Sequence, residues 1–175
     1  MHIAVVSLGA FGHVNPTLEL VTELVRRGVR VTYFCTEGFR TIVEPTGARF
    51  VAVPSWMEAH AGESGEDKSD VAATVPFLFL HEAEAYLEPV LAVLKEDHPV
   101  AIVHDFAGIA GTLAADVLGV PNVMLYTSYP ANGEYSVAAG FETVSPEHPL
   151  RGSRRTGRPL CGAVRLPQDD RERDL

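Results

Sequence analysis

The sequence has 175 residues, of which 46% are hydrophobic and 21% charged, a composition typical of one globular domain with a sizeable core. Its net charge of −9 argues against a general nucleic-acid-binding protein. No apolar run approaches the ~18 residues of a transmembrane helix, and the first residues lack the basic stretch of a signal peptide. The two distant cysteines, Cys35 and Cys161, do not indicate a disulfide framework. We therefore expect a cytoplasmic protein without an integral membrane span.

Apolar runs and helical periodicities alternate along the first 126 residues. Short, almost entirely apolar runs are typical of strands buried on both faces of a parallel sheet. Such runs cover residues 2–8, 29–34, 49–53, 99–103 and 122–126. Helices are predicted over residues 16–27, 38–44, 71–96 and 108–118. Pro76 and Pro89 are expected to break the third of these into pieces. This order predicts an α/β fold, a Rossmann-like doubly wound parallel sheet.

Charge divides the chain into two regions. Seven arginines and four acidic residues give residues 151–175 a net charge of +3, which leaves −12 for the rest of the chain. This last stretch has no sustained apolar periodicity, as is typical of disordered segments. We therefore predict a Rossmann-like domain over residues 1–148 and a basic, disordered tail over residues 149–175. The polar residues 55–70 are expected to form a long mobile loop.

The turn after the first apolar run contains Gly9, Gly12 and His13. Glycine allows the tight turn, and Asn15 and Pro16 suit the N-cap and first position of a helix. The pattern therefore predicts a helix that begins at Pro16, with His13 in the turn before it. In an open parallel sheet, this turn lies at the carboxyl end of a strand, where such folds bind ligands.

A second polar pair, His104 and Asp105, follows the fourth apolar run, and the loops after the first and fourth strands can converge. A carboxylate bonded to one imidazole nitrogen orients the ring, and the other nitrogen can then deprotonate an alcohol. The alternatives are a solvated or capping His13 and an Asp105 that caps the next helix. His104 is expected to point away from Asp105, because successive strand residues face opposite sides.

Other nucleotide and metal sites have weaker support. A dinucleotide-binding turn has three glycines, whereas Phe11 here takes the place of the second, which disfavours a nucleotide-binding oxidoreductase. The acidic residues between 58 and 70 show no ligand spacing, so no metal is expected.

Four motifs together resemble one family. Gly12-His-Val-Asn-Pro16 follows an apolar strand, and Thr46-Gly-Ala48, Val103-His-Asp105 and Leu118-Gly-Val-Pro121 come after it. Over residues 1–145 this order is similar to the N-terminal domain of the GT-B glycosyltransferases that glycosylate natural products, particularly the macrolide group of actinomycetes. The resemblance implies that His13 deprotonates an acceptor hydroxyl and that Asp105 is its partner. The acceptor oxygen would then displace the diphosphate of a nucleotide sugar with inversion.

The resemblance also implies that residues 1–148 bind the acceptor, an apolar hydroxylated molecule such as a macrolide. Apolar side chains in or near loops on the expected face are the candidate wall of its pocket. These are Phe11, Trp56, Phe77, Phe106 and Tyr129.

The family has a second domain that holds the nucleotide sugar, and nothing in this sequence matches its His- and glycine-rich motif. We therefore expect an acceptor half without a donor half and little or no transferase activity from the chain alone. No cofactor is expected, and a nucleotide sugar such as UDP-glucose would be a co-substrate only with a donor domain. The change of composition near Pro149 fits a frameshift, a truncated product or a natural short form.

Three alternatives to a transferase half remain open at this point. The first is a non-catalytic protein that binds the aglycone or pairs with a protein supplying the donor half. The second is the nucleotide-binding oxidoreductase disfavoured above. The third is a gene remnant without present function, whose uncovered face would make it poorly soluble.

Overall fold

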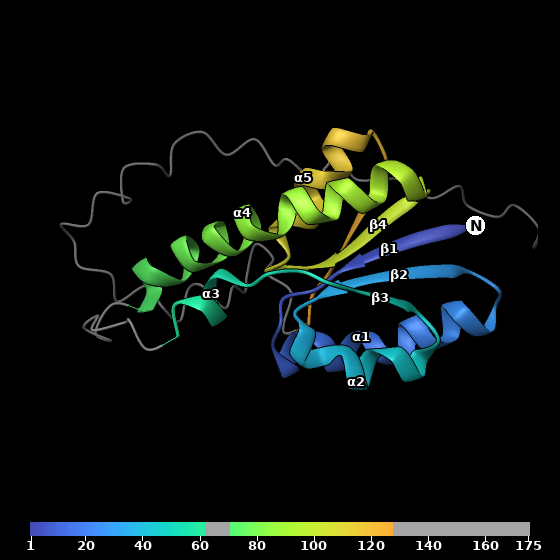
Figure 1. Ribbon diagram of the computed structural model, residues 1–175, viewed down its shortest axis with the longest axis horizontal. Coiled ribbons are helices and arrows are strands. Elements are labelled where there is room, and N and C mark those ends of the chain that lie inside the picture. Colours follow the sequence, from blue (N-terminus) through green and yellow to red (C-terminus); the bar gives the residue numbers. More distant parts are fainter. Residues whose placement is uncertain (62–70, 128–175) are drawn as a thin grey trace, which may run out of the picture. The chain divides into compact units, whose positions relative to one another are not determined.

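The computed structural model describes residues 1–61 and 71–127, apart from the side chains of residues 71–74 (Figure 1). The predicted domain boundary at residue 148 and the predicted tail 149–175 lie outside these residues. The described part contains one five-stranded parallel sheet in the order β3-β2-β1-β4-β5. Its strands are β1 (His2–Val6), β2 (Arg30–Cys35), β3 (Arg49–Ala52), β4 (Ala101–Asp105) and β5 (Asn122–Leu125).

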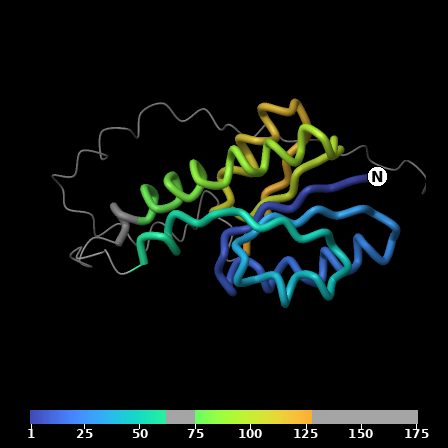
Figure 2. Tube along the Cα trace, in the orientation of Figure 1, coloured from blue at the N-terminus to red at the C-terminus, as the bar shows by residue number. Residues whose placement is uncertain are grey.

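Helices cover both faces of this sheet, as the doubly wound prediction requires. On one face lie α1 (Phe11–Arg26), η1 (Glu37–Phe39), α2 (Arg40–Val43) and η2 (Glu44–Thr46) (Figure 1). On the other face lie α4 (Val71–Asp97) and α5 (Ile109–Leu118). The short helix α3 (Trp56–Ala59) lies beside α4. The chain moves outward from β1 to β3 and then returns to place β4 on the other side of β1 (Figure 2). The loops after β1 and β4 therefore diverge to opposite faces, and this is the point where such sheets bind ligands.

Two apolar clusters hold the layers together. Val5 of β1 packs toward α1 with Val14 and Val21, whereas its neighbour Val6 packs toward α4 with Val90. All of these side chains are almost completely buried. Since successive strand residues face opposite sides, burial of both faces explains why β1, β2 and β4 are continuously apolar. The same expectation is wrong for β5, which lies at the edge of the sheet and is largely exposed within the described part of the chain.

The first helix begins earlier than predicted. It starts at Phe11 rather than Pro16, so His13 lies in its first turn and not in the preceding loop. Ala10 takes the N-cap position, where it accepts the Val14 N–H at 2.9 Å. Pro16 deprives the Gly12 carbonyl of one helical hydrogen bond. Val14 is fully buried, and its packing in the core outweighs the capping preference of Asn15 and Pro16.

The long helix α4 is also unbroken at Pro76 and Pro89, which contradicts the prediction of separate pieces. Tyr86, Val90 and Leu94 are buried against the sheet around Pro89, and this packing holds the helix across the missing N–H. The first part of α4 projects past the carboxyl edge of the strands (Figure 1). No helix among the described residues is long and apolar enough to span a bilayer.

Part of the predicted mobile loop 55–70 is a short helix. Ser55 caps α3 by accepting the Glu58 N–H at 3.0 Å. The rest of that prediction, residues 62–70, lies outside the described part of the chain.

Candidate active site

The structure brings His13 and Asp105 together at the carboxyl edge of the sheet. His13 projects from the first turn of α1, and Asp105 is the last residue of β4. The distance between His13 Nδ1 and Asp105 Oδ1 is 2.9 Å. The Asp105 side chain is fully buried, whereas that of His13 is 17% exposed. The pair therefore has its carboxylate inside the protein and its imidazole open to a bound molecule.

Backbone groups hold the Asp105 carboxylate in place. The Leu8 N–H donates to Oδ2 at 2.7 Å, and the N–H groups of Ala107 and Gly108 donate to Oδ1 at 2.8 and 3.2 Å. Burial alone would raise the pKa of Asp105, but the hydrogen bonds from His13 and the Leu8 N–H outweigh it and hold this pKa below its ordinary value. Asp105 is therefore ionised near neutral pH.

The charge of Asp105 determines the tautomer of His13. An ionised carboxylate can only accept hydrogen bonds, so the His13 Nδ1 atom carries the proton. The Nε2 atom of the neutral ring is then a free acceptor. This is the arrangement in which an imidazole can act as a general base.

His104 points to the opposite face of the sheet, as predicted. Its Nδ1–H donates to the Asp105 carbonyl oxygen at 2.9 Å, and Thr112 Oγ1 donates to its Nε2 atom at 3.0 Å. Its ring is 1% exposed, so both nitrogens are satisfied in the interior. A Cβ atom on Gly111 would lie 2.5 Å from His104 Cβ, so glycine is needed for α5 to pack against this histidine.

A second glycine shapes the loop after β1. A Cβ atom on Gly9 would lie 2.5 Å from Thr36 Oγ1, which follows β2. Glycine therefore allows the β1–α1 loop to approach the end of the neighbouring strand and to present the Leu8 N–H to Asp105.

A cluster of three aromatic side chains lies beside His13. The Phe106 ring lies 5.2 Å from the imidazole, and the rings of Phe79 and Tyr126 lie 6.3 and 6.4 Å from Phe106. Phe106 was predicted for this wall, and it lies beside His13. Phe79 and Tyr126 were not predicted. Tyr126 follows the fifth strand at the same edge of the sheet, so its place near the site could have been predicted from the sequence. The place of Phe79 could not, because it depends on where α4 packs.

The other predicted wall residues are not in aromatic contact with His13 or Phe106 in the described part of the chain. Phe11 is 68% exposed and packs edge-on against Phe39 at 5.1 Å. Trp56 stacks between two imidazoles, those of His60 at 4.3 Å and His81 at 4.6 Å. Phe77 is 58% exposed. Tyr129 lies outside the described residues.

Residues 1–61 and 71–127 contain no group of three or more histidine, cysteine or acidic side chains that could hold a metal ion.

Comparison with known proteins gives this geometry a family context. The chain is 36% identical over 149 residues to the NDP-glycosyltransferase YjiC of Bacillus licheniformis. The matched segment covers 83% of this chain and 36% of the relative. It is 36% identical over 127 residues to the oleandomycin glycosyltransferase of Streptomyces antibioticus, covering 71% of this chain and 29% of that one. The crystal structure of the calicheamicin glycosyltransferase CalG4 superimposes with a TM-score of 0.72 at 32% identity, over 79% of this chain and 35% of CalG4.

The chain is related to the macrolide and natural-product glycosyltransferases. This confirms the resemblance found in the four sequence motifs, and the α/β sheet is that of the GT-B structures. No family model matches the sequence. The chain spans about a third of the length of the curated relatives it matches.

Proposed function

We propose that this chain provides the acceptor-binding, base-bearing half of an inverting glycosyl transfer. The reaction would move a sugar from a nucleotide sugar to a hydroxyl group of an apolar natural product such as a macrolide. The observation that carries the proposal is the 2.9 Å contact between His13 and the buried, ionised Asp105, in a chain related to glycosyltransferases. A histidine that only caps a helix or faces solvent has no requirement for a buried carboxylate hydrogen-bonded to its Nδ1 atom.

In this proposal, His13 is the general base. Its Nε2 atom takes the proton of the acceptor hydroxyl as the acceptor oxygen attacks the anomeric carbon. The new carbon–oxygen bond forms as the bond from that carbon to the diphosphate breaks, and the nucleoside diphosphate leaves with the electron pair. The Asp105 carboxylate holds the Nδ1–H and stabilises the imidazolium ion that results. No covalent protein intermediate is needed, so the sugar is transferred with inversion.

The surroundings of His13 favour an apolar acceptor. Phe106, Phe79 and Tyr126 present aromatic rings at the mouth of the site, and each is at least partly exposed. Burial of an apolar molecule against such rings contributes roughly 25 cal/mol for each Å² removed from water. The polar group that must remain accessible is the hydroxyl that faces His13.

We assign the nucleotide sugar to a second domain or a partner protein. The support for this assignment is length, because the matched segment is only 36% of the Bacillus licheniformis relative. UDP-glucose is a suitable first donor to test. Binding of an acceptor by the full chain, with no turnover even once a donor half is supplied, would instead favour a non-catalytic, auxiliary role.

The test is a chimera that joins residues 1–127 to the remaining, donor-side part of the YjiC relative. It is incubated with UDP-glucose and a macrolide, and the glycosylated product is measured by mass spectrometry. We expect His13→Ala to lower the rate by about 10²–10⁴-fold, the usual contribution of a general base. His104→Gln is the matched control, since His104 is a neighbouring buried histidine without a proposed role in transfer. Full turnover by the His13→Ala chimera would refute the assignment of the base.

A further inference from the structure

The first turn of α1, which carries His13, has little support of its own. Its N-cap residue, Ala10, makes no side-chain capping bond, and Pro16 leaves the Gly12 carbonyl without its helical partner. A Cβ atom on Gly12 would enter open space, so the outer side of this turn is not packed. The position of His13 relative to Asp105 therefore depends on what holds the turn from inside the protein.

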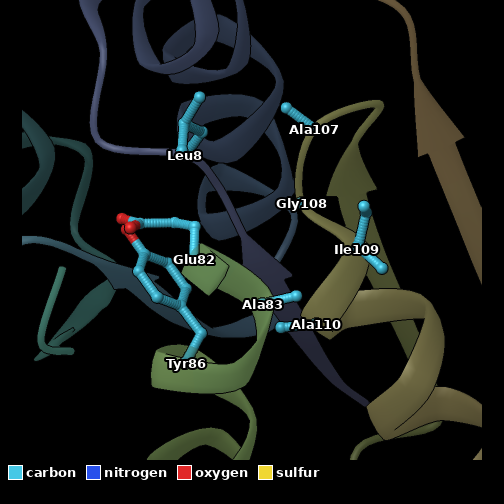
Figure 3. A pocket seen from close by; sticks show the side chains of 8 residues that line it. All are labelled: Leu8, Glu82, Ala83, Tyr86, Ala107, Gly108, Ile109 and Ala110. Carbon is cyan, nitrogen blue, oxygen red and sulfur yellow. The ribbon is translucent and has the colours of Figure 1, made fainter. Parts of the chain in front are cut away.

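The loop before this turn is not clamped from the side of α4. Leu8 and Ala107, whose N–H groups bind the Asp105 carboxylate, border a small cavity of about 10 Å³ (Figure 3). Ala83 and Tyr86 of α4 line the same cavity, so the loop and α4 leave a gap about the size of one water molecule. The support for the loop therefore lies on its other side, where α1 packs on β2.

A chain of buried hydrogen bonds joins α1 to β2 on that side. Thr17 Oγ1 donates to the Val14 carbonyl oxygen at 2.7 Å, and the distance from Thr17 Oγ1 to the Tyr33 hydroxyl is also 2.7 Å. Since the single proton of the Thr17 hydroxyl goes to the carbonyl, Tyr33 is the donor to Thr17. Val14, Thr17 and Tyr33 are each at most 1% exposed. Their hydrogen bonds are therefore shielded from competition with water.

The Tyr33 hydroxyl is a permanent donor in this place. Burial raises the pKa of Tyr33 to about 12, although hydrogen bonds with Ser7 and Thr17 act to lower it. The phenol therefore keeps its proton over the whole pH range in which imidazole titrates. Ser7 is also fully buried, and it begins the loop that leads from β1 to α1. One hydroxyl thus lies beside both the start of this loop and the first turns of the helix.

We propose that Thr17 and Tyr33 are positioning residues that hold the His13 ring against Asp105. His13 and Thr17 are four residues apart, so they lie on the same side of α1, and the Val14 carbonyl joins Thr17 to the residue next to His13. A shift of this turn away from β2 would lengthen the 2.9 Å contact between His13 and Asp105. The effect of the two residues on glycosyl transfer rests on the proposed function, whereas their effect on the ring does not.

Thr17→Val tests this role in the full chain, because valine keeps the branched shape of threonine and lacks the hydroxyl. Imidazole ¹⁵N spectra, recorded below the Tm of each variant, measure the share of His13 rings with the proton on Nδ1. We expect this share to fall in Thr17→Val and to return to the native value in Thr17→Ser, which restores the hydroxyl.

The chimera described above provides the second measurement. Thr17→Val should lower kcat by about 10-fold, because a displaced base is poorly aligned with the acceptor hydroxyl. KM for the acceptor should stay unchanged, because Phe79, Phe106 and Tyr126 keep their places.

Thr46→Val is the matched control. Thr46 is also buried, and its hydroxyl donates to the Val43 carbonyl oxygen at 2.7 Å, three residues back as for Thr17. It lies in η2 and takes no part in the hydrogen bonds that join α1 to β2. Thr46→Val should therefore lower the free energy of unfolding and leave both the Nδ1 share of His13 and kcat at their native values.

A native Nδ1 share in Thr17→Val would overturn the positioning role, and so would an equal loss of this share in Thr46→Val. Where Thr17→Val does not fold, Tyr33→Phe takes its place with the same expected results, because it removes the donor to Thr17 and leaves the bond from Thr17 to Val14. A chimera that is inactive even with the native residues would count against the proposed function alone. The ring measurement in the full chain would still decide the positioning role.

Discussion

Replacing Asp105 by asparagine should weaken both the fold and the function of the His13 site. The carboxylate receives four hydrogen bonds, from His13 Nδ1–H and from the backbone N–H groups of Leu8, Ala107 and Gly108. An asparagine side chain has one acceptor oxygen and one NH2 group. Its oxygen can keep the bonds made by Oδ1, and its NH2 group then faces the Leu8 N–H.

The expected cost follows from this geometry. The buried Leu8 N–H loses an acceptor at 2.7 Å and meets a second donor instead. A buried donor without a partner costs about 1–3 kcal/mol. In a chain of this length each kcal/mol lowers Tm by about 2–4 °C. The remaining bond to His13 is no longer charge-assisted, so the imidazolium ion loses its stabilising partner.

Two measurements check this prediction. Urea unfolding of the full chain should give a free energy of unfolding lower by about 1–3 kcal/mol for Asp105→Asn. Asp116→Asn, at an exposed aspartate of α5, should stay within about 0.5 kcal/mol of the native chain. Imidazole ¹⁵N spectra of the native chain should show the His13 proton on Nδ1, as the contact with Asp105 requires. Native stability of the Asp105→Asn chain together with a His13 proton on Nε2 would refute the reasoning, because Asp105 would then hold neither the loop nor the ring.

Three further predictions concern stability. The folded-state pKa of Asp105 lies below its unfolded value, so its contribution to the free energy of unfolding is full above about pH 4 and is lost as the pH falls through the folded pKa. Urea titrations from pH 6 to pH 2 should show this loss in the native chain and not in the Asp105→Asn chain. Tyr86→Phe removes a buried hydroxyl that has no hydrogen-bond partner among the described residues, so its free energy of unfolding should be unchanged or higher. A loss above about 1 kcal/mol would mean that the hydroxyl has a partner. Gly111→Ala places a methyl group 2.5 Å from His104 Cβ and should lower the free energy of unfolding by about 1–3 kcal/mol. Gly12→Ala places its methyl group in open space in α1 and should raise the free energy of unfolding by about 0.5–1 kcal/mol. Equal effects of the two substitutions in thermal melts would contradict the packing argument.

Much of the fold was readable from local pattern. The continuously apolar runs correctly predicted five parallel strands. The prediction of burial on both faces is correct for β1, β2 and β4, whereas β5 at the edge of the sheet is largely exposed among the described residues. Gly28, Gly47 and Gly119 each follow a predicted helix, and all three adopt positive φ, where other residues are strained. These features depend on only a few neighbouring residues, which a sequence displays directly.

The helix ends and prolines were harder to predict, because their outcome depends on distant packing. Asn15 and Pro16 form a good local helix start, yet α1 begins at Phe11, since the full burial of Val14 contributes more than a cap. Pro89 is a local helix breaker, yet α4 continues through it between buried side chains.

The sequence by itself determined that His13 and Asp105 stand at the carboxyl ends of two strands, because position in a βα unit is a local property. Only the tertiary structure decided that they meet at 2.9 Å, that Phe79 joins their surroundings and that Glu82 is buried. A glutamate on a long helix is ordinarily a solvated residue. Here the packing of α3 and the loop after β1 against α4 encloses it, and no spacing along the chain encodes which elements will cover a given side chain.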